Sequence, residues 1–168
     1  MQYLKIPSER ISILIGEHGR VKRQIEDRTK TKIEIEDTSI TVDGDSFGEW
    51  RAKDIVLAIG RGFNPEIALR LLNEDNTLEI INLKDFANSE NAINRLRGRI
   101  IGEGGKARRI MEEVAGVSLS IYGKSIGIIG NYDDVATAKE AIRMLIRGAR
   151  HASVYGFLER SRGRYKSI

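Results

Sequence analysis

The chain has 168 residues, of which 40% are hydrophobic and 31% charged, with a formal net charge of +4. This composition fits a packed core rather than disorder, and the absence of cysteine excludes disulfides, thiolate metal sites and cysteine nucleophiles. No run approaches the roughly 20 apolar residues of a spanning helix and no signal peptide is evident, so we expect a cytoplasmic protein without membrane association.

In chain order, the first half predicts an extended segment over residues 3–6 and a short apolar helix over residues 8–14. A glycine loop follows, Gly16-Glu17-His18-Gly19, and a helix is expected from Arg20. Alternating apolar residues then indicate one strand from Lys32 and another from Ser39, before a helix from Phe47. Pro65 is suited to the first position of a linker helix over residues 63–76.

The second half predicts the same elements in the same order. An extended segment over 78–83 and a helix over 91–100 lead to a second glycine loop, Gly102-Glu103-Gly104-Gly105. Apolar residues at 107, 110, 111 and 114 share one face of the next helix, which should end at Gly116. Two strands form a hairpin that turns at residues 122–125, and Asn131 or Asp133 can cap a long closing helix.

A shift of 86 residues superimposes the two halves without a gap, from Ile15 on Ile101 to Gly62 on Gly148. Nearly fifty residues with the same apolar period indicate two copies of one structural unit. Each copy is strand, helix, Gly-x-x-G, helix, strand, strand, helix. We therefore expect an α+β fold in which three-stranded antiparallel sheets are each backed by three helices. The expected boundaries are 1–62, a 63–76 linker, 77–150, and a basic, partly flexible tail over 151–168.

The glycine loops predict an anion-binding surface. A glycine without a Cβ lets the backbone approach a ligand closely, and the helix that begins at the loop directs free N–H groups and its positive dipole end toward a phosphate. Six basic residues surround the second loop against one acid, Glu103, and a second basic run extends from Arg143 to Lys166. The segment from Glu34 to Asp54 is instead rich in acids.

Both copies resemble type I KH domains (β-α-α-β-β-α), whose Gly-x-x-G loop clamps about four nucleotides of a single strand. More narrowly, the sequence is similar to the archaeal Dim-two, or partner-of-Nob, ribosome-assembly family. The segments that carry this similarity are residues 58–65, 68–72, 100–106 and Val154-Tyr155-Gly156. The resemblance implies binding to pre-ribosomal RNA near the 3′ end of small-subunit rRNA. It also implies as partners the PIN-domain endonuclease Nob and other small-subunit assembly or translation factors.

The loops depart from many KH loops because neither carries a basic residue between its glycines. Arg20 and Lys106, which directly follow the loops, can offset Glu17 and Glu103. The candidate RNA-binding residues are Gly16, Glu17, His18, Gly19, Arg20, Arg23, Arg95, Arg97, Arg99, Gly102, Glu103, Gly104, Gly105, Lys106, Arg108 and Arg109.

Two alternatives remain. The first loop lies in an acid-rich copy and could dock a protein, so a protein-docking scaffold with secondary RNA contact competes with an RNA clamp. Catalysis is not expected, because the sequence has no Walker A motif, no third glycine of a dinucleotide site and no cluster for a metal or a triad. No cofactor is predicted.

Overall fold

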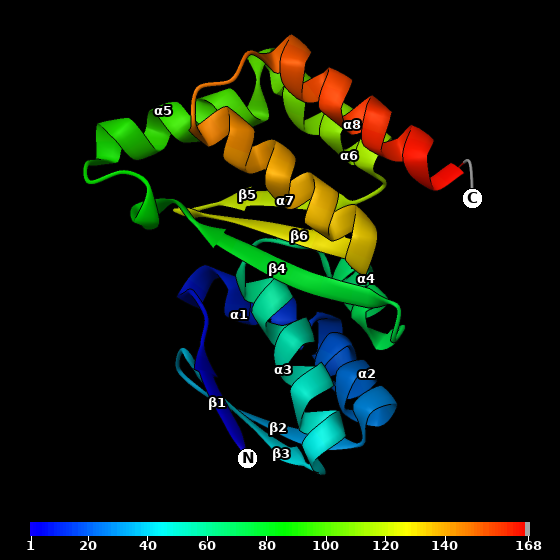
Figure 1. Ribbon diagram of the computed structural model, residues 1–168. Coiled ribbons are helices and arrows are strands. Elements are labelled where there is room, and N and C mark those ends of the chain that lie inside the picture. The colour runs from blue at the N-terminus through cyan, green and yellow to red at the C-terminus, as the bar shows by residue number, and fades with distance from the viewer. Residues whose placement is uncertain (167–168) are drawn as a thin grey trace. The chain divides into compact units, whose positions relative to one another are not determined.

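The computed structural model describes residues 1–166, with side chains described through residue 162. It divides into two compact units, and the boundary falls between Asn76 and Thr77. Each unit contains a three-stranded sheet with helices packed against it (Figure 1). Among the residues that the structure describes, no helix is long and apolar enough to cross a membrane.

The first unit contains, in order, β1 (Gln2–Lys5), α1 (Ser8–Ile15), the 3-10 turn η1 (Glu17–Gly19), α2 (Arg20–Thr29), β2 (Thr31–Glu36), β3 (Ser39–Gly44), α3 (Ser46–Gly60), α4 (Pro65–Ala68) and the 3-10 turn η2 (Leu69–Leu72). Its sheet has the order β1-β3-β2, and both strand pairs are antiparallel. Ile33 on β2 pairs with Val42 on β3, and both side chains are buried. The order leaves β2 at an edge of the sheet.

The second unit contains β4 (Asn76–Asn82), the 3-10 turn η3 (Leu83–Asp85), α5 (Glu90–Ile101), the 3-10 turn η4 (Glu103–Gly105), α6 (Lys106–Ala115), β5 (Ser118–Tyr122), β6 (Ser125–Asn131), α7 (Tyr132–Ile146) and α8 (His151–Lys166). Its sheet has the order β4-β6-β5, so β5 lies at an edge as β2 does. Leu119 on β5 pairs with Ile128 on β6, and both are buried in the core. The α+β fold with three-stranded antiparallel sheets is therefore confirmed.

The long helices α3 and α7 end with the same backbone pattern. Gly62 and Gly148 follow them with φ angles of 100° and 99°, a left-handed conformation that glycine adopts without strain. In each case the residue after the glycine donates its N–H back into the last turn, from Phe63 to Ala58 (3.1 Å) and from Ala149 to Met144 (3.0 Å). These residues are related by the 86-residue shift, so the repeat extends to hydrogen-bond detail.

An arginine from the helix before each glycine loop also binds these helix ends. Arg10 on α1 and Arg99 on α5 each donate two guanidinium hydrogen bonds to backbone carbonyls. The acceptors are Ile59 (2.7 Å) and Phe63 (2.8 Å) for Arg10, and Leu145 (3.2 Å) and Ala149 (2.6 Å) for Arg99. Each arginine thereby adds a charged donor to one carbonyl of the last helical turn and to one carbonyl just beyond the helix.

Two segments differ from the expectations. The linker helix over 63–76 is reduced to α4 and a 3-10 turn, with Pro65 at the first helical position and Asn64 as the side-chain cap. The expected flexible tail from residue 151 is wrong over the described residues, because 151–166 form α8. Val154 and Leu158 of α8 are buried, and the helix packs on α6 and α7. Residues 167–168 lie outside the described residues.

Candidate nucleic-acid interface

The two glycine loops have nearly the same backbone conformation. The first residue has φ and ψ of 75° and 175° at Gly16, and of 75° and 170° at Gly102. The third residue is left-handed in both loops, with φ of 54° at His18 and 60° at Gly104. The last residue has φ of 76° or 78°. The sequence repeat therefore specifies one loop shape twice, although only the second loop has glycine at the third position.

The first glycine of each loop is required by close packing as well as by its dihedral angles. A Cβ at Gly102 would lie 2.7 Å from the Ala107 Cβ, and one at Gly16 would lie 2.5 Å from a Val21 methyl carbon. At Gly104, by contrast, a Cβ would meet nothing within 4 Å. The third loop position is thus open to solvent, or to a ligand.

The helices that start at the loops lack a side-chain cap. Gly19 and Gly105 occupy the cap positions of α2 and α6. Neither has a side chain that could accept a hydrogen bond from the free N–H groups of the first turn. The closing helices are capped instead, α3 by Asp45 and α7 by Asn131. Because no acidic residue lies in the first turn of α2 or α6, their N–H groups and positive dipole ends are available to an anion.

Three basic side chains stand exposed beside the second loop. Lys106 and Arg108 lie in the first turn of α6, and the Arg108 Nε is 3.1 Å from a carboxylate oxygen of Glu112. Arg109 folds back over the loop and donates from Nη1 to the Gly104 carbonyl at 2.7 Å. That bond uses one of five donors, so the Arg109 guanidinium remains able to bind a phosphate at the loop.

The edge strand β5 lies beside this loop. The Leu119 N–H donates to the Glu112 carboxylate at 3.3 Å and therefore points away from β6. Because inward and outward groups alternate along an antiparallel strand, the N–H and carbonyl of Ile121 also point away from the sheet. Between loop and strand lies a groove of about 320 Å³, lined by Ile101, Gly105, Arg108, Arg109, Glu112 and Ile121. It combines an apolar floor, a cationic wall and a free strand edge.

A corresponding groove of about 690 Å³ lies in the first unit. It is lined by Ile15, Lys22, Lys32, Ile33, Glu34, Ile35, Glu36, Ser39 and Thr41. The Glu26 carboxylate accepts the Ile33 N–H at 2.9 Å, as Glu112 does for Leu119. Two lysines and two glutamates line this groove, whereas two arginines and one glutamate line the other. The grooves therefore share a geometry but not a charge.

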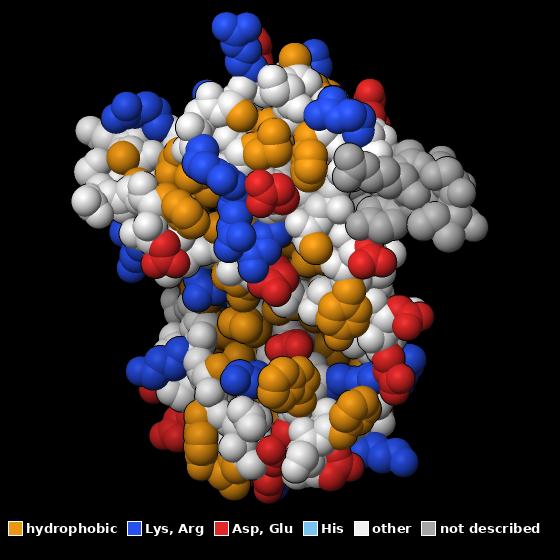
Figure 2. Space-filling view, in the orientation of Figure 1, with side chains coloured by type: hydrophobic (Ala, Val, Ile, Leu, Met, Phe, Trp, Pro, Cys, Tyr) orange, Lys and Arg blue, Asp and Glu red, His pale blue; other side chains and the backbone are white. Residues whose placement is uncertain are grey.

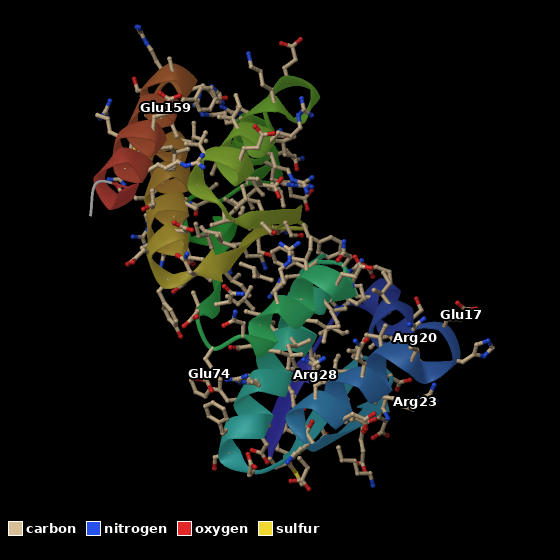
Figure 3. All side chains as sticks on the ribbon, turned by 90° about the vertical axis from the view of Figure 1, so that its right-hand side faces the viewer. Glu17, Arg20, Arg23, Arg28, Glu74 and Glu159 are labelled. Atoms are coloured by element: carbon tan, nitrogen blue, oxygen red, sulfur yellow. The ribbon has the colours of Figure 1, made fainter. Side chains whose placement is uncertain are left out.

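The predicted residues of the first loop gather at one end of α2. Figure 3 shows Glu17, Arg20 and Arg23 together at the loop, whereas Arg28 lies toward the other end of the helix. Glu17 and His18 are both 89% exposed, with 3.8 Å between Glu17 Oε1 and His18 Nε2. The first loop thus places two arginines beside one carboxylate at the start of α2.

The three predicted arginines of α5 do not form part of the groove. Arg95 is exposed, and the Arg97 Nε is buried without a hydrogen-bond partner among the described atoms. Arg99 binds the end of α7 through the two carbonyl contacts described above. The Arg99 guanidinium is thus engaged by the backbone of its own unit, and Arg99 is not proposed as an RNA contact.

Basic side chains also gather over α7 (Figure 2). Lys139 and Arg143 on this helix, and Arg147 directly after its last residue, are spaced four residues apart. Two of them are paired, Lys139 with Glu79 at 3.3 Å and Arg147 with Glu140 at 3.1 Å. This stripe lies outside the groove lining and is partly neutralised, so it is not the strongest anion site of the unit. Arg164 and Lys166 lie outside the described side chains.

The groove floor and the strand edge were not among the residues predicted from the sequence. Ile101 and Ile121 lie twenty residues apart, and only the fold brings them together. A signal for them was present, because both are apolar residues at or next to the end of an element: Ile101 is the last residue of α5 and Ile121 the second-last of β5. The role of Glu112 could have been suspected from its counterpart at Glu26, since both glutamates fall at matched positions of the repeat.

Comparisons with known proteins agree with this geometry. Residues 77–163 match the model of a eukaryotic type KH domain (KH-domain type I), and residues 1–58 match that of a KH domain. A KH domain-containing protein of Methanocaldococcus jannaschii is 48% identical over 99% of this chain and 76% of its own length. The pre-rRNA-processing protein pno1 of Aspergillus fumigatus is 30% identical over 88% of this chain. The chain spans only 58% of that fungal relative.

A solved structure gives the same result. A chain from the complex of a/eIF2α, aDim2p and rRNA of Pyrococcus horikoshii superimposes with a TM-score of 0.90 and 50% identity. The alignment covers 97% of this chain and 94% of that one. The fold and its glycine loops thus define a KH-domain protein. Within that class, the chain belongs to the Pno1/Dim2 family of ribosome-assembly proteins, which confirms the resemblance inferred from sequence.

Proposed function

We propose that this protein binds single-stranded RNA without catalysing a reaction, and that its second unit clamps the phosphate backbone on the Gly102–Gly105 loop. The observation that carries the proposal is the uncapped start of α6, where free N–H groups meet three exposed cations. A phosphate on the loop would accept hydrogen bonds from these N–H groups and from Arg109 or Lys106.

In the proposal, the bases lie in the groove along β5. Ile101 and Ile121 provide an apolar surface for them, and the outward N–H and carbonyl of Ile121 can pair with a base edge. A double-stranded helix does not fit this arrangement, because its base edges are already paired. The expected ligand is therefore a single strand of about four nucleotides.

The RNA is proposed to be pre-ribosomal, near the 3′ end of the small-subunit rRNA. The fungal relatives named as pre-rRNA-processing proteins support this assignment, as does the archaeal Dim2p complex that contains rRNA. We also propose that both units are type I KH domains, on the basis of their shared strand–helix–helix–strand–strand–helix order. The nuclease Nob and a factor like a/eIF2α are proposed partners, by family likeness alone.

The first loop has the backbone shape of a phosphate clamp, with Arg20 and Arg23 at its side. Because its backbone conformation matches that of the second loop, the first loop stays a predicted RNA contact, with residues Gly16, Glu17, His18 and Gly19. The groove next to them differs from the second groove in the charge of its lining.

Salt dependence tests the clamp. If it neutralises about three to six phosphates, the logarithm of the affinity for a single-stranded fragment of the rRNA 3′ end should fall with the logarithm of salt concentration, with a slope of about −2 to −4. Fluorescence anisotropy of a labelled oligonucleotide between 50 and 300 mM salt, about a sixfold range, measures this slope. A slope near zero would contradict the proposal, and equal affinity for a duplex of the same sequence would contradict the single-strand assignment.

A charge placed at Gly104 tests the position of the phosphate. Gly104 is left-handed and unobstructed, and Asp and Asn tolerate that conformation better than other residues do. Gly104→Asp should weaken RNA binding by about fivefold or more, because a carboxylate would lie beside a phosphate. Gly104→Asn is the matched neutral control and should bind within about twofold of the parent. Equal affinities for the two variants would place the phosphate elsewhere.

A further inference from the structure

Exposed arginines of the second unit lie where the end of α7 meets α5, and the proposed clamp uses none of them. They are Arg95 on α5, Arg143 on α7, Arg147 directly after α7 and Arg150 just before α8, and we call these residues the arginine ridge. Arg99, one turn after Arg95, joins the two helices through the carbonyls of Leu145 and Ala149. Because residues four apart share a helix face, Arg95 lies on the side of α5 that faces α7.

The charge of the ridge is only weakly compensated. Arg95, Arg143 and Arg150 have no ion pair among the described side chains. The Arg147 Nη2 lies 3.1 Å from a Glu140 carboxylate oxygen, but the two side chains are 64% and 45% exposed, and water screens such a surface pair. The ridge therefore presents three uncompensated positive charges and one partly compensated charge to solvent.

The repeat shows that the fold does not require two of these arginines. By the 86-residue shift, Leu57 stands in the place of Arg143 and Asn64 in the place of Arg150. The first unit forms the same closing helix without either charge. Arg143 lies in the last turn of α7, where a cation also favours the helix dipole, but Arg150 lies beyond the helix. The cationic ridge is thus a property of the second unit alone.

The ridge offers charge without a surface for bases. Among the described residues of this unit, the exposed large hydrophobic side chains are Phe86, which lies before α5, and Tyr132, at the start of α7. Tyr132 is about 17 Å along the helix from Arg143. A bound single strand needs side chains on which its unpaired bases can stack, whereas a duplex keeps its bases stacked inside and presents its backbone. The ridge therefore fits the backbone of a duplex.

Helix α5 connects the ridge to the groove. Ile101, its last residue, lines the groove, and Arg95 lies six residues earlier, about 9 Å along the helix axis. A duplex cannot enter the groove, because its base edges are already paired. A short stem that directly adjoins a strand in the groove can nevertheless reach the ridge without a long spacer.

We propose that the arginine ridge binds the phosphate backbone of a double-stranded RNA stem that adjoins the single strand in the groove of the second unit. Arginine suits this role because its planar fork of donors matches the oxygens of a phosphate. The inference rests on the proposed single-strand clamp and deepens it, since the target becomes a junction between a stem and a strand. Two linked contacts on one RNA then bind more tightly than either contact alone.

Labelled RNAs that share one single-stranded segment test the proposal by anisotropy on the full chain. The first is the strand alone, about twice the length of four nucleotides that a KH loop holds. Two others carry a short hairpin stem at the 5′ or the 3′ end of the strand. One of these junctions should bind about tenfold or more tighter than the strand, with a salt slope steeper by about 2 to 3. Equal affinity of the strand and both junctions would overturn the proposal.

An unpaired extension distinguishes a stem from a longer single strand. The control RNA extends the strand with unpaired uridines that add as many phosphates as the stem does. It should gain about threefold at most, because the ridge has no stacking surface for its bases. If the extension gains as much as the better junction, the ridge holds a single strand and the assignment to a stem is wrong.

Matched double variants locate the stem. Arg143→Gln with Arg150→Gln should weaken the junction by about fivefold or more and leave the affinity for the strand within about twofold. The control is Arg160→Gln with Arg162→Gln, which removes the same charge from exposed positions about 14 Å or more beyond the start of α8 at His151. It should change both affinities by less than about twofold. Equal weakening of the junction by both pairs would show a response to net charge alone and would overturn the site.

Gly104→Asp separates a failure of the ridge from a failure of the clamp. This variant should weaken the strand and the junction by the same factor, because both RNAs place a phosphate on the loop. If the parent protein does not bind the strand, the clamp is wrong and the junction model falls with it. If the parent binds the strand, and Gly104→Asp weakens it, but neither stem adds affinity, the clamp stands and the ridge proposal alone is overturned.

Discussion

Arg10 and Arg99 bind equivalent backbone carbonyls at the end of the closing helix, but they lie at different positions of the repeat. Shifted by 86 residues, Arg10 falls on Leu96 and Arg99 falls on Ile13, yet the carbonyls that the two arginines bind correspond one to one. The requirement therefore lies in the acceptors at the helix end, and either of two helix positions can supply the donor. The sequence predicts Arg99 as part of an anion-binding cluster, but in the structure its guanidinium donates to backbone carbonyls.

We predict that Arg99→Ala lowers the free energy of unfolding by about 1–3 kcal/mol, because two partly buried carbonyls lose a charged donor. Arg99→Lys should restore little, since one ammonium cannot reproduce the two-pronged contact. Denaturant unfolding measures both variants, with the exposed Arg95→Ala expected within about 0.5 kcal/mol of the parent. A stable Arg99→Ala protein with fivefold weaker RNA binding would return Arg99 to the RNA site.

Helix α8 is the element on which sequence reasoning failed. Its arginines suggested a solvated tail, but Val154 and Leu158, one turn apart, form the apolar face that packs on α6 and α7. The spacing of Val154 and Leu158 was visible in the sequence. It could not predict a packed helix, because the hydrophobic surface that the two side chains cover forms only when α6 and α7 have packed. The glycine loops, the hairpin and the Asn131 cap could be predicted because each depends on contacts between near neighbours in the chain.

If α8 is part of the core, Leu158→Ala should lower the free energy of unfolding by about 2–4 kcal/mol, as expected for a leucine that is 1% exposed. The exposed Ala152→Ser on the same helix is the control and should change it by less than about 0.5 kcal/mol. Chemical denaturation followed by circular dichroism compares them. Equal stability of the two variants would mean that α8 does not contribute to the fold.

At the scale of the whole molecule, one structural unit occurs twice and its two copies have diverged in charge. The duplicated loops were predictable because Gly-x-x-G leaves a local signal. The grooves were not, because each joins a loop to an edge strand that is distant in sequence. The acid-rich segment of the first copy was visible, but only the β2 register shows that Glu34 and Glu36 lie along a free edge.

The division between residues 76 and 77 predicts that the units are separable. A fragment of residues 77–168 should unfold cooperatively and bind single-stranded RNA by itself, with an affinity that falls as the salt concentration rises. A fragment of residues 1–76 should also unfold cooperatively. Calorimetry and anisotropy on each fragment test this, and a folded 77–168 fragment without RNA binding would show that the clamp needs both units.

Glu26 and Glu112 have a consequence for solubility. An open strand edge invites the same edge of another molecule, and sheets that join in this way grow into aggregates. Each glutamate takes one N–H of its edge strand, at Ile33 or Leu119, and sets a negative charge beside it. What remains open is a stretch around one residue, Ile35 or Ile121. That stretch can hold a ligand but offers a second sheet few groups to pair with, so these carboxylates should oppose edge-to-edge association at β2 and β5.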